Sequence, residues 1–181
     1  MGLMMISLRQ TLTLVVAAVL IAALPAAVAP ESAQARSCKG ANTASKKLTK
    51  KKARAAIQCL VNKNRSAKNL RPNKNLQQAA QAHTRYMRKH NCFSHQCPGE
   101  PSLEGRVRRT GYLRGARSFA LGEVIAHNRS RATPRDIVRQ WMRSSSHRAT
   151  LRNSTYRHLG VGVSVRNGRA FYTVVVGKKS G

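Results

Sequence analysis

Hydrophobic and polar positions follow a helical period in three stretches of the first two thirds of the chain. Over residues 49–63, apolar residues recur three and four positions apart between lysines and arginines, which predicts an amphipathic helix. A second amphipathic helix is predicted to start near Pro72, because proline suits the first helical turn, and to end before Asn91. A short third helix is predicted over residues 103–110, with Gly111 as its stop.

A strand and a fourth helix are predicted next. The apolar density of residues 119–126 predicts a strand. A helix is then expected to begin at Thr133, whose hydroxyl can cap it, while Pro134 at the first helical position loses no hydrogen bond and Asp136 faces the positive end of the helix dipole. We expect this helix to end within residues 144–146, which are all serine.

The end of the chain carries the pattern of a β-hairpin. Two apolar runs, residues 159–165 and 170–176, flank Asn167 and Gly168, and an Asn-Gly pair suits the type I′ turn that joins two antiparallel strands. Helices first and strands gathered late predict an α+β domain rather than a wound parallel sheet. A length of 181 residues fits one such domain.

The N-terminus has the layout of a secretory signal peptide. Arg9 precedes an apolar run over residues 12–24, and small residues follow up to Ala35 in an Ala-Gln-Ala ending. We expect cleavage after Ala35, which leaves a lead-in over residues 36–47 and a folded domain over residues 48–178. The alternative, an uncleaved anchor, needs a longer apolar run. No other run is long enough to cross a bilayer, so the mature protein is expected to be secreted, extracellular or cell-wall associated.

Export changes what the four cysteines are expected to do. In an oxidising compartment an even number of cysteines favours disulfides, and four cysteines allow three pairings. Cys92 and Cys97 are close enough to close a small loop, which leaves Cys38 to pair with Cys59 and tie the lead-in to the first helix. A zinc site with four thiolates is the alternative, but the paired Cys-x-x-Cys spacing of such sites is missing.

The chain is strongly basic, with 34 Lys and Arg, 5 Asp and Glu and a formal net charge of +29. Because 41% of its residues are hydrophobic, it can form a core and is not a disordered polycation. Such a surface can bind an anionic polymer, the cell wall or lipid headgroups through charge; basic runs lie at residues 46–52 and 106–109. Only 4% of residues are aromatic, and no recognised nucleic-acid motif occurs, so specific nucleic-acid binding is not expected. We expect a monomer.

Several short motifs, in order and at the right spacing, resemble the CAP superfamily of cysteine-rich secretory, antigen 5 and pathogenesis-related 1 proteins. The motifs are Phe93-Ser94-His95, Gly111-Tyr112, Gly122-Glu123, Trp141-Met142-Arg143-Ser144, Ser146-His147-Arg148 and Leu159-Gly160-Val161-Gly162-Val163. The resemblance covers about residues 57–176 and is strongest to the short bacterial secreted members with an SCP-like domain. It implies an α-β-α sandwich, in which helices cover both faces of a small antiparallel sheet. It also raises lipid binding, which some members show.

The resemblance further implies a cleft with two histidines and two glutamates. By motif, His95 and His147 are the histidines and Glu123 is the first glutamate. Ser144 stands where the second glutamate is expected, and Val124 replaces the asparagine that normally follows Glu123. The four-residue set is therefore reduced to three, and Ser144 takes the fourth place in the candidate cleft.

Three interpretations of His95, Glu123 and His147 stay open. They can form a hydrogen-bonded network that orders loops. They can bind Zn²⁺ or another divalent cation, because two imidazoles and one carboxylate leave positions for water. Catalysis demands more: a serine hydrolase needs Ser94 or Ser144 activated by a histidine. We assign no catalytic residue and favour a protein that is not an enzyme.

The remaining acidic residues and histidines are weaker candidates for a functional site. A glycosidase needs two carboxylates that flank the scissile bond, and Glu100 and Glu104 are expected on a loop and a short helix beyond the cysteines. His83 lies on the apolar face of the second helix and is interpreted as a core residue; His127 follows the predicted strand and could reach the cleft. The sequence thus predicts an extracellular binding module, with a metal-dependent or serine-type hydrolase and a purely structural polycationic protein as alternatives.

Overall fold

The computed structural model describes residues 37–181, so the predicted signal peptide over residues 1–35 lies outside the described residues. Residues 36–181 form one compact unit. Its elements, in chain order, are η1 (Ser45–Lys47), α1 (Lys50–Lys63), β1 (Arg71–Pro72), α2 (Lys74–Lys89), α3 (Leu103–Arg109), β2 (Ser118–Arg129), α4 (Pro134–Arg143), α5 (Ser145–Arg152), β3 (His158–Arg166) and β4 (Arg169–Ser180).

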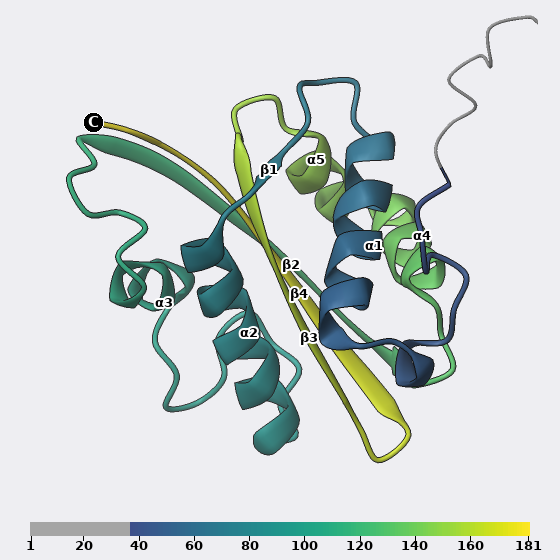
Figure 1. The fold of residues 1–181 in the computed structure, drawn as a ribbon. Coiled ribbons are helices and arrows are strands. Elements are labelled where there is room, and N and C mark those ends of the chain that lie inside the picture. Colours follow the sequence, from purple (N-terminus) through teal and green to yellow (C-terminus); the bar gives the residue numbers. More distant parts are fainter. Residues whose placement is uncertain (1–36) are drawn as a thin grey trace, which may run out of the picture. The chain divides into compact units, whose positions relative to one another are not determined.

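The strands form one four-stranded sheet in the order β1-β3-β4-β2 (Figure 1). The hairpin predicted around Asn167 and Gly168 is confirmed: β3 and β4 pair antiparallel on either side of this turn, and both turn residues have positive φ. Strand β2 pairs antiparallel with the outer side of β4. The short β1 pairs parallel with β3, so the sheet predicted to be antiparallel is mixed at that edge.

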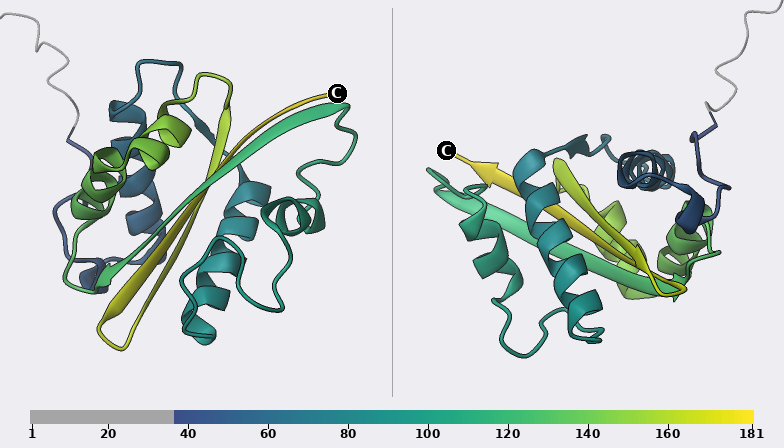
Figure 2. Two further views of the ribbon diagram at one scale, coloured as in Figure 1. Left: turned by 180° about the vertical axis from the view of Figure 1, so that it is seen from behind. Right: turned by 60° about the horizontal axis from the view of Figure 1, so that its bottom comes forward.

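Helices cover both faces of the sheet (Figures 1 and 2). Helices α1, α4 and α5 lie on one face, and α2 and α3 lie on the other. Successive side chains of β4 serve the two faces in turn: Tyr172 and Val174 belong to the core beneath α1 and α4, while Phe171 and Val175 pack on the α2 side. This arrangement of layers confirms the α+β class and the predicted α-β-α sandwich.

Two helix boundaries differ from the prediction. The second helix begins at Lys74, because the Asn73 side chain accepts hydrogen bonds from two backbone amides of the first turn, and Pro72 lies in β1 instead. Residues 144–146 are not simply the end of a helix: Ser144 ends α4 and its hydroxyl caps α5. The predicted cap of α4 is confirmed, with Thr133 and Asp136 in a reciprocal capping box.

Both predicted disulfides are present. Cys38 pairs with Cys59, and Cys92 pairs with Cys97. The first bond ties the lead-in to α1, and the buried Ser45 hydroxyl adds a hydrogen bond to the carbonyl of Ala132. Within residues 37–181, no helix has the length and apolar character needed to cross a bilayer.

Candidate functional site

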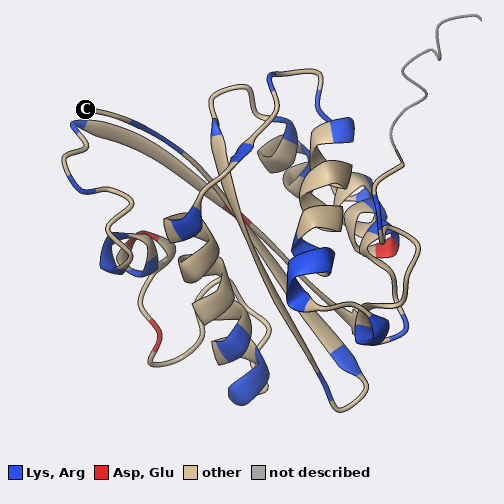
Figure 3. Ribbon diagram, in the orientation of Figure 1, with Lys and Arg blue, Asp and Glu red and all other residues tan. Residues whose placement is uncertain are grey.

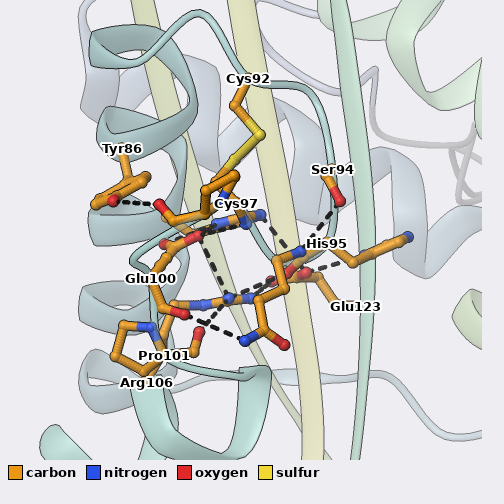
Figure 4. Close-up of a disulfide and its surroundings, with 12 residues drawn as sticks. Tyr86, Cys92, Ser94, His95, Cys97, Glu100, Pro101, Arg106 and Glu123 are labelled. Carbon is orange, nitrogen blue, oxygen red and sulfur yellow. Dashed lines mark hydrogen bonds and ion pairs between the residues drawn. A yellow bond between two sulfur atoms is a disulfide. The ribbon is translucent and has the colours of Figure 1, made fainter.

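The loop between α2 and α3 carries the first candidate site residue, His95. The Cys92–Cys97 disulfide closes this loop, and the Tyr86 hydroxyl of α2 donates a hydrogen bond of 2.7 Å to the carbonyl of Pro98 (Figure 4). These two restraints hold a segment that has no regular secondary structure. The His95 side chain is 56% exposed, and its ring contacts Glu123 of β2.

Glu123 lies beneath this loop, in the middle of β2, with a carboxylate that is only 2% exposed. Its Oε1 lies 3.0 Å from Nδ1 of His95, and its Oε2 accepts a hydrogen bond of 2.7 Å from Nη2 of Arg106. A buried carboxylate is stable only when hydrogen-bonded or paired with a cation. Arg106 and His95 together meet this need.

A second carboxylate, Glu100, is bound to the same arginine from the other side (Figure 4). Nη1 of Arg106 lies 3.6 Å from Oε2 of Glu100, and the Glu100 carboxylate also contacts Nδ1 of His83 at 2.8 Å. All three side chains are at most 4% exposed. Arg106 donates further hydrogen bonds to the carbonyls of His95 and Pro101, so one guanidinium fixes both carboxylates and the loop.

His83 completes this buried cluster, which we define as His83, Glu100, Arg106 and Glu123. Its side chain is fully buried, as predicted for a residue on the apolar face of α2. It is more than a packing residue, because Nδ1 hydrogen bonds to Glu100 and Nε2 lies 3.7 Å from Oε1 of Glu123 without a hydrogen-bond partner.

His147 and Ser144 come from the junction of α4 and α5. The Ser144 hydroxyl accepts a hydrogen bond from the backbone amide of His147 and contacts the Ser146 hydroxyl. Ser144 therefore caps the N-terminus of α5. Burial lowers the pKa of His147 below its usual value, and the nearby His95 lowers it further. His147 therefore lies near His95, but the direct contact to Glu123 comes from His95.

Glu123, as it is arranged here, has no carboxylate oxygen free for a metal ion. Each oxygen of Glu123 already contacts a protein donor, so a cation would have to displace His95 or Arg106. In the part of the chain that the structure describes, no three His, Cys, Asp or Glu side chains gather into a group that could hold a metal ion. The zinc site at His95, Glu123 and His147 stays a prediction.

The geometry also bears on two kinds of hydrolase, a glycosidase and a serine hydrolase. Glu100 lies much nearer Glu123 than the sequence suggested, but the Arg106 guanidinium bridges the two carboxylates and fills the space that a glycosidase leaves for sugar and water. The Ser144 hydroxyl contacts the backbone amide of His147 and the Ser146 hydroxyl, whereas a nucleophile requires a hydrogen bond to a base.

Sequence reasoning missed the roles of Glu100 and Arg106. Arg106 was predicted to belong to a surface basic run, which is wrong, because its side chain is 4% exposed and ion-paired. The available signal was the charge order of the segment, in which Glu100 and Glu104 come within ten residues of Arg106, Arg108 and Arg109. Opposite charges at this density predict internal pairing rather than a free basic patch.

The comparisons with known proteins agree with the motifs. The model of the cysteine-rich secretory protein family (CAP) matches residues 34–177. The uncharacterized protein YkwD of Bacillus subtilis is 31% identical over 123 residues, which cover 66% of this chain and 45% of that protein. The chain thus spans less than half the length of this relative.

Solved structures show the same fold. An extracellular protein containing an SCP domain from Bacillus anthracis is 28% identical, with a TM-score of 0.60, over 70% of this chain and 40% of that one. An outer surface protein of Borrelia burgdorferi is 19% identical, with a TM-score of 0.55, over 68% and 87% of the two chains. With a family model that spans most of its length and the sandwich fold of SCP domains, this chain belongs to the cysteine-rich secretory protein family.

Proposed function

We propose that this protein is a secreted binding module that holds an anionic polymer of the cell envelope on its cationic surface, without chemical turnover. The signal-peptide pattern ending at Ala35 supports export. The similarity to an extracellular SCP-domain protein supports the same compartment.

The observation that carries this proposal is that the acidic residues of the described domain, which are few beside the many lysines and arginines (Figure 3), are all paired within the protein. Glu100 and Glu123 are buried against Arg106. Glu104 is paired with Arg108 at 2.6 Å, and Asp136 caps α4. Among residues 37–181 no carboxylate side chain is left unpaired, so the other lysines and arginines have no acidic partner. Most of them are exposed, whereas Arg65 is buried and donates to backbone carbonyls. Such a surface attracts polyanions and repels cations.

The test is binding of residues 36–181, with both disulfides formed, to immobilised alginate and to inorganic polyphosphate. We expect saturable binding that weakens steeply between roughly 50 mM and 200 mM salt, because ions released from the polymer favour association. The double variant His95→Ala/His147→Ala should bind equally well. Absence of binding at low salt, or binding lost in the histidine variant, would refute the proposal; binding only to anionic lipid vesicles would redirect it to membranes.

Titration calorimetry with Zn²⁺ separates this proposal from a metal-dependent alternative. Because Arg106 and His95 already occupy the Glu123 carboxylate, we expect no stoichiometric zinc binding near micromolar concentration. Stoichiometric binding that disappears in His95→Ala/His147→Ala would make His95, Glu123 and His147 a metal site and would justify a search for hydrolase activity.

A further inference from the structure

Three adjoining hollows lie along the end of the sheet that carries the β3–β4 turn. The largest, about 710 Å³, is lined by the end of α2 and by the residues around the turn. It shares Arg169 with a second hollow of about 440 Å³ at the end of β2. The second shares Asn128 and Gln140 with a third, of about 390 Å³, beside α4. Because neighbouring hollows share lining residues, the three adjoin one another around this end of the sheet, and we refer to them together as the groove.

Basic side chains line this groove throughout. We call its free cations the basic track: Arg88, Lys89, Arg129, Arg143, Arg166 and Arg169. The one acidic residue in the three walls is Asp136, which is engaged with Thr133 and Arg139. The salt bridges within residues 37–181 use other arginines, namely Arg106, Arg108 and Arg139.

The centre of the track is a row of three arginines across three neighbouring strands. Arg129 of β2 is directly opposite Arg169 of β4, and Arg169 is directly opposite Arg166 of β3. Residues directly opposite in antiparallel strands point to the same face with Cβ atoms about 5 Å apart, and like charges in these positions destabilise the sheet. All three residues are exposed. Arg88 and Lys89 have an ordinary role at the end of α2, where cations favour the helix dipole, but the row has no such role.

An aromatic strip borders the row. The His127 ring lies 5.8 Å from the ring of Phe171, which lines the first hollow, and 4.5 Å from the ring of Phe93. Phe93 extends from the disulfide loop and is 46% exposed. An exposed ring beside a row of cations offers an apolar face for a sugar and charges for its acidic groups.

The geometry points to a polysaccharide-binding groove in which the basic track binds the phosphate or carboxylate groups of an anionic glycan and Phe93 contacts a sugar ring. This inference rests on the proposed function and assigns it a place on the molecule. Nucleic acid is the less suitable occupant, because a strip whose exposed rings are Phe93 and His127 offers few positions for stacked bases.

The test compares two variants with equal loss of charge. Arg129→Gln/Arg166→Gln/Arg169→Gln removes the row, and Arg109→Gln/Arg114→Gln/Arg117→Gln removes three exposed arginines of the α3 region. Binding to alginate and to polyphosphate is measured against salt. In a plot of log affinity against log salt concentration, each contact between a cation and an anionic group contributes a slope of about 0.7. The row variant, which loses three such contacts, should therefore show a slope smaller by about 2 and an affinity at low salt lower by roughly tenfold or more. The control should lose less than half of this.

A second pair of measurements separates sugar contact from charge. Phe93→Ser should weaken binding of alginate severalfold and leave polyphosphate binding unchanged, since polyphosphate has no sugar. Thermal unfolding of the row variant should show a stability equal to or above that of the wild type, because a like-charge row has been removed.

Each failure has its own meaning. A wild-type protein that binds no polyanion contradicts the proposed function itself. A wild-type protein that binds, with the row and control variants weakened equally, overturns only the groove. Equal loss of alginate and polyphosphate binding in Phe93→Ser would show that Phe93 does not contact a sugar. In a competition experiment, single-stranded DNA that displaces bound alginate at a lower concentration than free alginate needs would identify nucleic acid, not a glycan, as the occupant.

Discussion

At the scale of single residues, Arg106 is the side chain on which the buried cluster depends. It is the cation shared by Glu100 and Glu123, and it also bonds to the carbonyl of His95. Replacing it by glutamine leaves two buried carboxylates without their shared cation. Loss of one partner from a buried ion pair costs about 3–5 kcal/mol, so Arg106→Gln should lower the free energy of unfolding by this amount in a urea titration.

The matched control for this change is Arg108→Gln, two residues along the same helix. Arg108 pairs with Glu104 at 2.6 Å, but both side chains are about half exposed, and exposed pairs contribute under about 1 kcal/mol. Equal urea midpoints for Arg106→Gln and the wild type would show that the buried cluster adds nothing to stability.

His158 gives the protein a residue-scale response to pH. Burial lowers the pKa of His158, and the charges of Arg71 and Lys179 lower it further. Its Nδ1 lies 2.9 Å from the Tyr112 hydroxyl; burial raises the pKa of Tyr112 to about 12, so this hydroxyl stays a donor to neutral His158.

Because the folded state favours neutral His158, its contribution to stability is complete above the unfolded pKa of about 6.5 and is lost as pH falls below that value. Unfolding temperatures measured from pH 7.5 to 5 should therefore fall less steeply for His158→Asn, whose amide oxygen can accept the same hydrogen bond without titrating. Identical pH slopes in the two proteins would contradict this role.

The residues of the cluster differ in how far the sequence could predict them. The resemblance to the CAP superfamily implied that Glu123 and His95 share a cleft, and in the structure their side chains are in contact. His83 was predicted to be buried, and it is, but helical periodicity cannot show that Glu100 approaches it from a loop that has no period. Contacts between irregular segments depend on the tertiary path of the chain, which a one-dimensional pattern does not contain.

At the scale of elements, two glycines of β3 set how closely α2 lies on the sheet. A Cβ added to Gly162 would stand 2.3 Å from the carbonyl oxygen of Ala80, and one added to Gly160 would stand 2.0 Å from the backbone of α2. These distances are far inside van der Waals contact. The glycines therefore let the backbones of a helix and a strand touch directly.

Gly162→Ala should force α2 away from β3 and lower the free energy of unfolding by about 3 kcal/mol, the upper range for an overpacked core. Gly105→Ala on α3 is the control: its nearest neighbour, Cβ of Pro101, would lie 3.1 Å away, and a change within about 1 kcal/mol is expected, because alanine favours helix. Urea titration of both variants checks this, and a Gly162→Ala protein as stable as the control would show that α2 can shift without cost.

Element types were predictable where the local pattern had one interpretation. The Asn167-Gly168 turn with its apolar flanks and the Thr133 cap of α4 follow from local chemistry, and both are confirmed. The junction at Ser144 was missed because serine suits a helix end and a helix start equally well. A short helix such as α5, with Leu151 as its buried residue, has too few apolar positions to reveal its period.

At the scale of the whole molecule, a net charge of +29 must repel itself. In the described domain the carboxylates are already paired internally, so salt has few surface ion pairs to weaken and much repulsion to screen. The Debye length falls from about 30 Å at 0.01 M salt to about 8 Å at 0.15 M. The unfolding temperature should therefore rise over this range, by roughly 2–4 °C for each kcal/mol of repulsion removed.

Comparing two anions at equal ionic strength separates charge screening from binding to the basic track. Screening depends on ionic strength alone, whereas occupation of the basic track stabilises the folded state by mass action. At equal ionic strength, millimolar polyphosphate should therefore raise the unfolding temperature of the wild type more than chloride does. The extra rise should be smaller in Arg129→Gln/Arg166→Gln/Arg169→Gln than in the α3-region control, because the row variant binds polyphosphate more weakly. An unfolding temperature that falls with chloride would mean that surface ion pairs, not self-repulsion, dominate the electrostatics of the fold.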